Sequence, residues 1–78
     1  MNRPQKPVDE SALAGKVGAR IKVQRLKKRL SVLEAAGHAG VSATMWNSWE
    51  DGRRLPLDRL PAIAAALGCS VRSLMPPG

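Results

Sequence analysis

The sequence predicts an all-α domain of five short helices, and two observations lead to this fold class. The chain has 78 residues and no phenylalanine or tyrosine, so alanine, leucine, valine and two tryptophans must form its core. Such a composition suits helices better than strands, in which aromatic and β-branched residues are enriched. Helix-capping residues also recur at short intervals along the chain, and no strand pattern competes with them.

A chain this short can bury only one small core. We expect one domain over residues 9–75, preceded by a flexible N-terminal arm, residues 1–8, that carries two prolines and almost nothing to bury. Residues 76–78 form a C-terminal tail, because two consecutive prolines stop the last helix. No internal repeat divides the chain further.

The first helix is expected to begin at Asp9 or Ser11, either of which can serve as its N-cap. Its last turn is the basic run 27–29, which suits the negative end of the helix dipole. Gly15 and Gly18 lie inside this helix and weaken it, since glycine is a poor helix former. The residues that recur at helical spacing on its buried face are Leu13, Val17 and Ile21.

The next two helices form a predicted helix-turn-helix. Ser31 and Glu34 have the spacing of a capping box, in which each side chain bonds the other residue's backbone N–H. Gly40 ends this helix, because glycine tolerates the positive φ that the turn requires. Ser42 caps the following helix, which runs to Asp51. Its buried side is marked by Trp46 and Trp49, three residues apart.

The C-terminal third of the chain predicts two further helices after a loop over residues 53–56. Pro61 lies in the first turn of the fourth helix, where proline is favoured, and Gly68 stops that helix. Ser70 caps a last helical turn that carries Val71 and Leu74.

The charge balance favours a polyanionic partner. Thirteen lysines and arginines against six acidic residues give a net charge of +7, a strong basic bias for so small a chain. Cys69 is the only cysteine and cannot form an internal disulfide, and no apolar run is long enough to span a membrane. His38 and Cys69 lie on different predicted elements, without the spacing of a metal site or a nucleophile. We therefore expect a cytoplasmic binding protein that is not an enzyme, with no cofactor, no metal and no membrane partner.

Six stretches of the sequence resemble the phage-repressor, or Cro/cI-type (XRE), helix-turn-helix family. They are Gly18–Lys22, Leu30–Ser31, Gly40–Ser42, Trp49–Gly52, Leu60–Ala64 and Ala66–Gly68, and the resemblance extends from Val17 to Met75. It implies a lambda-repressor-like fold and a transcriptional regulator that binds double-stranded DNA. The family expectation is a repressor that occupies a near-palindromic operator as a homodimer, with the helix after Ser42 in the major groove.

The resemblance also implies residue roles. Ala43, Thr44 and Ser48 fall where the family places side chains that touch base edges, and Asn47 can contact adenine or phosphate. Arg25 and Glu50 match a pair that links the first helix to the end of the recognition helix in the family. Phosphate contacts are expected from Arg53 and Arg54, which follow the recognition helix, and from the N-caps Ser31 and Ser42.

Several positions depart from the family pattern, and they leave open a function other than DNA binding. Val32 stands where the family usually has a polar residue that holds a phosphate, and Asp51 would repel one. With Val23, Leu26 and Leu33, Val32 forms either an exposed apolar patch for a protein partner or a surface covered by the N-terminal segment.

The alternative functions are therefore a protein-interaction module or an antitoxin component, either of which would retain the helix-turn-helix fold with weak or no DNA reading. A dimer surface is expected around the last turn, at Val71, Leu74 and Met75.

Overall fold

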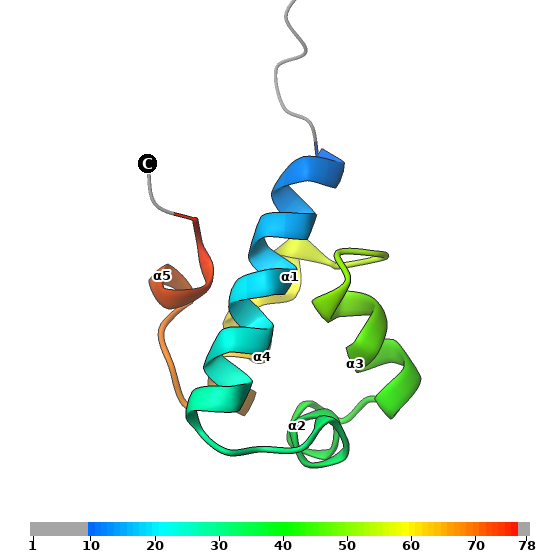
Figure 1. The fold of residues 1–78 in the computed structure, drawn as a ribbon, viewed down its shortest axis with the longest axis vertical. Coiled ribbons are helices and arrows are strands. Elements are labelled where there is room, and N and C mark those ends of the chain that lie inside the picture. The colour runs from blue at the N-terminus through cyan, green and yellow to red at the C-terminus, as the bar shows by residue number, and fades with distance from the viewer. Residues whose placement is uncertain (1–9, 77–78) are drawn as a thin grey trace, which may run out of the picture.

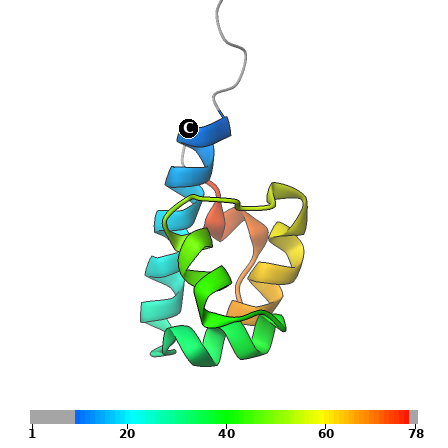
Figure 2. The same ribbon diagram turned by 90° about the vertical axis from the view of Figure 1, so that its right-hand side faces the viewer.

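The structure, a computed structural model, describes residues 10–76 and contains five α-helices and no strand within them. The elements are α1 (Glu10–Lys27), α2 (Val32–Ala39), α3 (Ala43–Glu50), the 3₁₀ helix η1 (Leu57–Arg59), α4 (Leu60–Leu67) and α5 (Val71–Leu74). The predicted all-α fold is confirmed. Figure 1 shows α1 as the long central helix, with α3 on one side of it and α5 on the other. α2 crosses the lower end of the molecule and packs against α3 and α4 (Figures 1 and 2).

The helix ends follow the predicted local chemistry. The capping box of α2 is complete, since Ser31 Oγ accepts the Glu34 N–H at 3.0 Å and Glu34 Oε1 accepts the Ser31 N–H at 2.8 Å. Ser42 and Ser70 cap α3 and α5, since the hydroxyl oxygen of each serine accepts a backbone N–H from the first turn of its helix. Gly40 and Gly68 end α2 and α4 in the left-handed conformation, with φ of 74° and 68°. These boundaries are therefore set by short-range sequence.

The core lies where the five helices meet. Trp46 and Ala35 are both fully buried, so a large residue and a small one share the interior, as volume conservation requires. The other residues of the buried cluster are Val17, Ile21, Ala36, Trp49, Leu60, Ile63, Ala64, Leu67 and Leu74. Burial of these apolar side chains is the main contribution to the stability of so short a chain.

The structure corrects two sequence predictions about the helices and adds one element that was not predicted. Ser11 lies inside α1, so it is not the N-cap, and Asp9 lies outside the described residues. Residues Leu57–Arg59 form a 3₁₀ helix that leads directly into α4, and no sequence pattern had indicated it. Leu74 is fully buried in the core of its own chain, so it cannot contribute to a dimer surface. The proposed arm, residues 1–8, lies outside the described residues.

Candidate nucleic-acid interface

The inner side of α3 is fixed in the core by two tryptophans. Trp46 is completely buried and Trp49 is 5% exposed, and their ring centroids lie 5.6 Å apart at a tilt of 52°. Tilted aromatic pairs at this distance add to the stabilisation from area burial. Because both rings project inward, the residues between and before them must face outward.

A buried polar network ties the end of α3 to α1. Arg25 Nε donates to Glu50 Oε2 at 2.6 Å, and Arg25 Nη2 donates to Glu50 Oε1 at 3.2 Å. The same carboxylate oxygen, Oε2, accepts the indole N–H of Trp46 at 2.6 Å. Arg25 Nη1 also donates to the carbonyl oxygen of Leu30 at 2.9 Å, which extends the network to the loop before α2.

This network gives the buried ion pair the partners it needs. The side chains of Arg25 and Glu50 are only 10% and 6% exposed, and charges that deep are stable only when they are paired and hydrogen-bonded. Arg25 and Glu50, which resembled a family pair in the sequence, are thus in direct contact. The added donor, Trp46, could not be assigned to Glu50 from the sequence, although the two residues are four apart on one helix.

Two glycines let the backbones of α1 and α3 come close together. A Cβ atom on Gly18 would lie 2.7 Å from the Glu50 carbonyl oxygen and closer still to that of Trp49. Gly52, just after α3, has φ of 78°, and a Cβ there would lie 2.6 Å from the Cα of Gly15. Gly18 therefore permits the contact that positions α3, although the sequence indicated only that it weakens α1.

The outer side of α3 carries small polar side chains. Thr44 and Asn47 are exposed, while Ala43 and Ser48 are half-buried. Ser48 Oγ donates to the Thr44 carbonyl oxygen at 3.1 Å, so its proton is already used within the helix. Thr44 and Asn47 are therefore the members of the predicted base-reading set with polar groups best placed for a ligand.

Met45 is an exposed residue of α3 that no sequence pattern had indicated as part of the interface. It is 42% exposed and follows Thr44 in the first turn of the helix. Its exposure follows from the helical repeat, because it precedes buried Trp46 by one position and is rotated away from the core. A methionine there adds an apolar, adaptable side chain beside the polar ones.

The N-caps Ser31 and Ser42 keep one hydrogen-bonding function free in this geometry. Each hydroxyl oxygen accepts a backbone N–H of its own helix, at 3.0 Å from Glu34 and 3.1 Å from Met45. The hydroxyl proton can still be donated to an anion. Both serines are exposed and lie at the positive ends of their helix dipoles. The Ser31 backbone N–H also holds the pKa of the Glu34 carboxyl below its ordinary value, with the Ser31 hydroxyl contact adding to the effect.

Arg53 and Arg54 differ in how freely their charges can be used. Arg53 Nη2 forms an exposed ion pair with Asp51 Oδ2 at 3.0 Å, which partly neutralises it and offsets the acid that the sequence placed at the end of α3. Arg54 is exposed and adopts φ of 52°, a left-handed conformation that non-glycine residues rarely take.

The exposed apolar positions separate into two groups. Val32 is half-buried and packs against the core, so it is not part of an exposed patch. Leu33 is 73% exposed on the first turn of α2, and Val23 and Leu26 are about half exposed on α1. The suggestion that the N-terminal segment covers this region falls outside the described residues.

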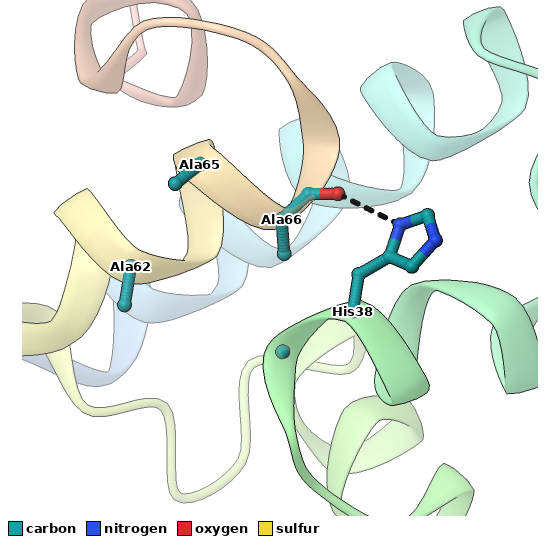
Figure 3. A pocket seen from close by; sticks show the side chains of 5 residues that line it. His38, Ala62, Ala65 and Ala66 are labelled. Atoms are coloured by element: carbon teal, nitrogen blue, oxygen red, sulfur yellow. Dashed lines mark hydrogen bonds between the residues drawn. The ribbon is translucent and has the colours of Figure 1, made fainter.

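A shallow pocket between α2 and α4 is lined by His38 and four alanines, Ala39, Ala62, Ala65 and Ala66 (Figure 3). The His38 Nδ1 atom lies 3.3 Å from the Ala66 carbonyl oxygen. Burial raises the pKa of the Cys69 thiol, which opposes formation of the reactive thiolate. Over residues 10–76 no group of three or more His, Cys, Asp or Glu side chains is arranged to hold a metal.

None of the described helices has the length and apolar character needed to cross a membrane.

The fold and the exposed side of α3 define a helix-turn-helix DNA-binding domain of the XRE type found in transcriptional regulators. The chain belongs to the helix-turn-helix domain family, which matches residues 16–75. No curated protein sequence matches the chain significantly.

Several solved structures are similar to this chain. A hypothetical transcription factor from Neisseria, NHTF, is 27% identical with a TM-score of 0.75, over 97% of this chain and 88% of that one. The clp gene regulator ClgR from C. glutamicum is 27% identical with a TM-score of 0.74, over 80% and 82%. The restriction-modification controller protein C.AhdI from Aeromonas hydrophila is 29% identical with a TM-score of 0.74, over 82% and 98%.

An enzyme also contains a similar fold. The hydroxypropylphosphonic acid epoxidase from S. wedmorenis is 26% identical with a TM-score of 0.77, but the match covers 86% of this chain and only 36% of the epoxidase. The likeness thus concerns about a third of that protein and transfers no catalytic role to this chain.

Proposed function

We propose that this protein is a sequence-specific transcriptional regulator that binds a near-palindromic operator as a homodimer. One observation carries the proposal: α3 is anchored by Trp46, Trp49 and the Arg25–Glu50 pair, while its opposite side is exposed and polar. A rigid helix with a free polar side is what major-groove reading requires. In a symmetric dimer two such helices enter successive major grooves about 34 Å apart.

In this proposal Thr44 and Asn47 read the bases. Asn47 carries a side-chain amide that can bond adenine at two positions, and Thr44 offers a hydroxyl and a methyl group. Ala43 and Met45 contribute apolar contacts, for which the thymine methyl group is the matching feature of the groove. Ser48 acts indirectly, because its hydroxyl bonds the Thr44 carbonyl oxygen.

Phosphate contacts position the helix on the duplex. Arg54 supplies a full charge directly after α3, and Arg53 supplies a charge that must separate from Asp51. Ser31 and Ser42 donate hydroxyl protons at two helix N-termini. With no lysine or arginine in α3 itself, the contacts that give affinity lie around the recognition helix rather than on it.

The test separates base reading from phosphate binding. A preferred site is selected from random duplexes, and its affinity is measured over a range of salt concentrations. Thr44→Ala with Asn47→Ala is expected to reduce discrimination between selected and random duplexes by about tenfold, because each good base contact contributes about 1–3 kcal/mol. Binding to random duplexes should change little.

Arg53→Gln with Arg54→Gln is expected to weaken binding to all duplexes and to lower the slope of log K against log salt by about 0.9 per lost phosphate contact. Arg72→Gln is the matched control, since Arg72 is exposed on α5, on the other side of α1 from α3 (Figure 1). If the chain shows no salt-dependent DNA binding, or if both sets of variants behave alike, the proposal is wrong.

A further inference from the structure

The outer face of α1 combines apolar and basic side chains that the DNA-binding function does not use. We call it the basic-apolar face. Val23 and Leu26 are 50% and 56% exposed, and because they are three residues apart on one helix they adjoin on its surface. The remaining members, all exposed, are Lys16, Ala19, Arg20, Lys22 and Lys27.

The helical repeat orders these residues into an apolar stripe with charged edges. Ala19, Val23 and Leu26 are spaced four and three residues apart and therefore share one side of the helix. Lys16, Arg20 and Lys27 lie along one edge of the stripe, and Lys22 lies along the other. The first edge borders α5, since Arg20 Nε donates to the Ser73 carbonyl oxygen at 3.3 Å.

The charge on this face is of one sign. No aspartate or glutamate occurs between residues 13 and 27, and Arg25 points inward to its buried partner Glu50. α1 packs against α3 and α5 through its other sides. Figures 1 and 2 show that α3 lies on a different side of the molecule from the outer face of α1. The basic-apolar face is thus exposed and positively charged, and it is separate from the proposed reading surface.

We infer that the basic-apolar face is a docking surface for an acidic amphipathic segment of another protein. Charge complementarity selects this partner, because acidic side chains can pair with both edges while apolar side chains cover Val23 and Leu26. DNA fits less well, since phosphates cannot use the apolar stripe. A second copy of the chain would bring like charges together across the same surface.

The chain's own N-terminal residues are also a poor match. Residues 1–9 contain two basic side chains, Arg3 and Lys6, and one acidic side chain, Asp9. They therefore lack the net negative charge that would complement the basic-apolar face. Residues 1–9 are therefore not the expected partner. This inference does not depend on whether α3 reads DNA.

A synthetic peptide provides the direct test. The probe is a helical peptide of about 20 residues with leucine along one side and glutamate along both flanks, titrated into the full ¹⁵N-labelled chain. We expect saturable chemical-shift changes centred on residues 16–27. A control peptide with the same glutamates but serine in place of leucine should bind about tenfold more weakly, because a few apolar anchors carry most of the energy of such interfaces.

Variants of the chain then locate the contact. Val23→Ser with Leu26→Ser should weaken binding of the leucine peptide about tenfold, and Lys16→Glu with Lys27→Glu should weaken it comparably. Leu33→Ser is the matched control, because Leu33 is more exposed, at 73%, but lies on α2. All of these side chains are exposed, so the variants should keep the fold, and thermal unfolding of each variant checks that loss of fold does not explain weaker binding.

Four results would overturn the inference. The first is no saturable shift at about 1 mM peptide, the weak end of ordinary affinities. The second is equal binding of the leucine and serine peptides, which would mean that charge alone accounts for binding to this face. The third is displacement of the peptide by a short DNA duplex that shifts the same α1 residues, which would identify DNA as the ligand of this face. The fourth is a dimer of the chain that Val23→Ser with Leu26→Ser dissociates, which would identify a second copy of the chain as the ligand.

Discussion

The two sides of α3 contrast in what they contribute. The inner side carries two buried tryptophans and a carboxylate that accepts bonds from both Arg25 and Trp46. The outer side carries Thr44 and Asn47, neutral side chains in contact with solvent. The inner side therefore determines where the helix lies, and the outer side determines what it can bind. Substitutions on the two sides should affect different measurements.

The largest effect is expected from Trp46. Trp46→Ala should lower the free energy of unfolding by about 3–5 kcal/mol, the cost of deleting a buried aromatic side chain, against a total of about 5–15 kcal/mol for typical domains. Urea denaturation followed by circular dichroism measures this loss. A change below about 1 kcal/mol would mean that Trp46 does not anchor α3.

Conservative variants sharpen the same prediction. Trp46→Phe keeps a ring but removes the indole N–H that bonds Glu50, whereas the indole nitrogen of Trp49 has no hydrogen-bond partner among residues 10–76. Trp46→Phe should therefore cost more stability than Trp49→Phe, because losing a partner of a buried charge is more costly than losing an unpaired donor.

The next largest effect concerns the contact between α1 and α3. Gly18→Ala should destabilise the domain by about 1–3 kcal/mol, since its Cβ would overlap backbone carbonyl oxygens of Trp49 and Glu50. Gly15→Ala is the control three residues earlier, where a Cβ would meet nothing within 4 Å. It should raise stability by about 0.5–1 kcal/mol, because alanine is the better helix former. Thermal unfolding compares the pair, and destabilisation by both substitutions would contradict the close approach at Gly18.

A smaller effect is expected at the start of α2, outside the buried contacts. The pKa of Glu34 is lower in the folded chain than its ordinary value of 4.5, so its stabilising contribution is present above pH 4.5 and is lost as the pH falls through the folded-state pKa. Glu34→Gln can still accept the Ser31 N–H and should remove this part of the pH dependence.

Unfolding titrations between pH 7 and 3 compare Glu34→Gln with the native chain. Ser31→Ala, which removes the cap itself, should cost about 1 kcal/mol at pH 7. Identical pH profiles for Glu34→Gln and the native chain would contradict the assignment.

The smallest stability effect is expected at Arg54, beyond the outer side of α3. Glycine accepts the φ of 52° without strain, but it also increases the freedom of the unfolded chain. These effects oppose each other, so Arg54→Gly should change stability by less than about 0.5 kcal/mol. Under the proposed function the same substitution should weaken DNA binding and lower its salt dependence, as fluorescence anisotropy can measure. A large loss of stability would show that the arginine side chain has a structural role.

The sequence predicted most of the fold because its helix boundaries depend on local chemistry. Ser31, Gly40, Ser42 and Gly68 act within one helical turn of their own positions, so their effects could be read in order along the chain. The 3₁₀ helix at 57–59 was missed since it has no side-chain cap. The prediction of Leu74 as a dimer contact was wrong because a short amphipathic turn does not reveal which neighbour covers it.

The candidate site was only partly predictable for the same reason. Thr44 and Asn47 were identified as base-reading candidates and are exposed, and that role stays a prediction. The bond from Ser48 to the Thr44 carbonyl and the exposure of Met45 became visible only once the orientation of α3 was known. Nothing in the local pattern showed that Arg53 pairs with Asp51.

The sequence by itself determined the class of the fold, the serine-capped starts of α2, α3 and α5, the glycine-terminated ends of α2 and α4 and the excess of positive charge. These follow from composition and from contacts within a few residues. Tertiary structure decided the role of Gly18, the second donor on Glu50 and the burial of Leu74. The contact at Gly18 joins residues up to 32 positions apart, Gly18 and Glu50, and such contacts arise only when packing fixes which helix faces meet.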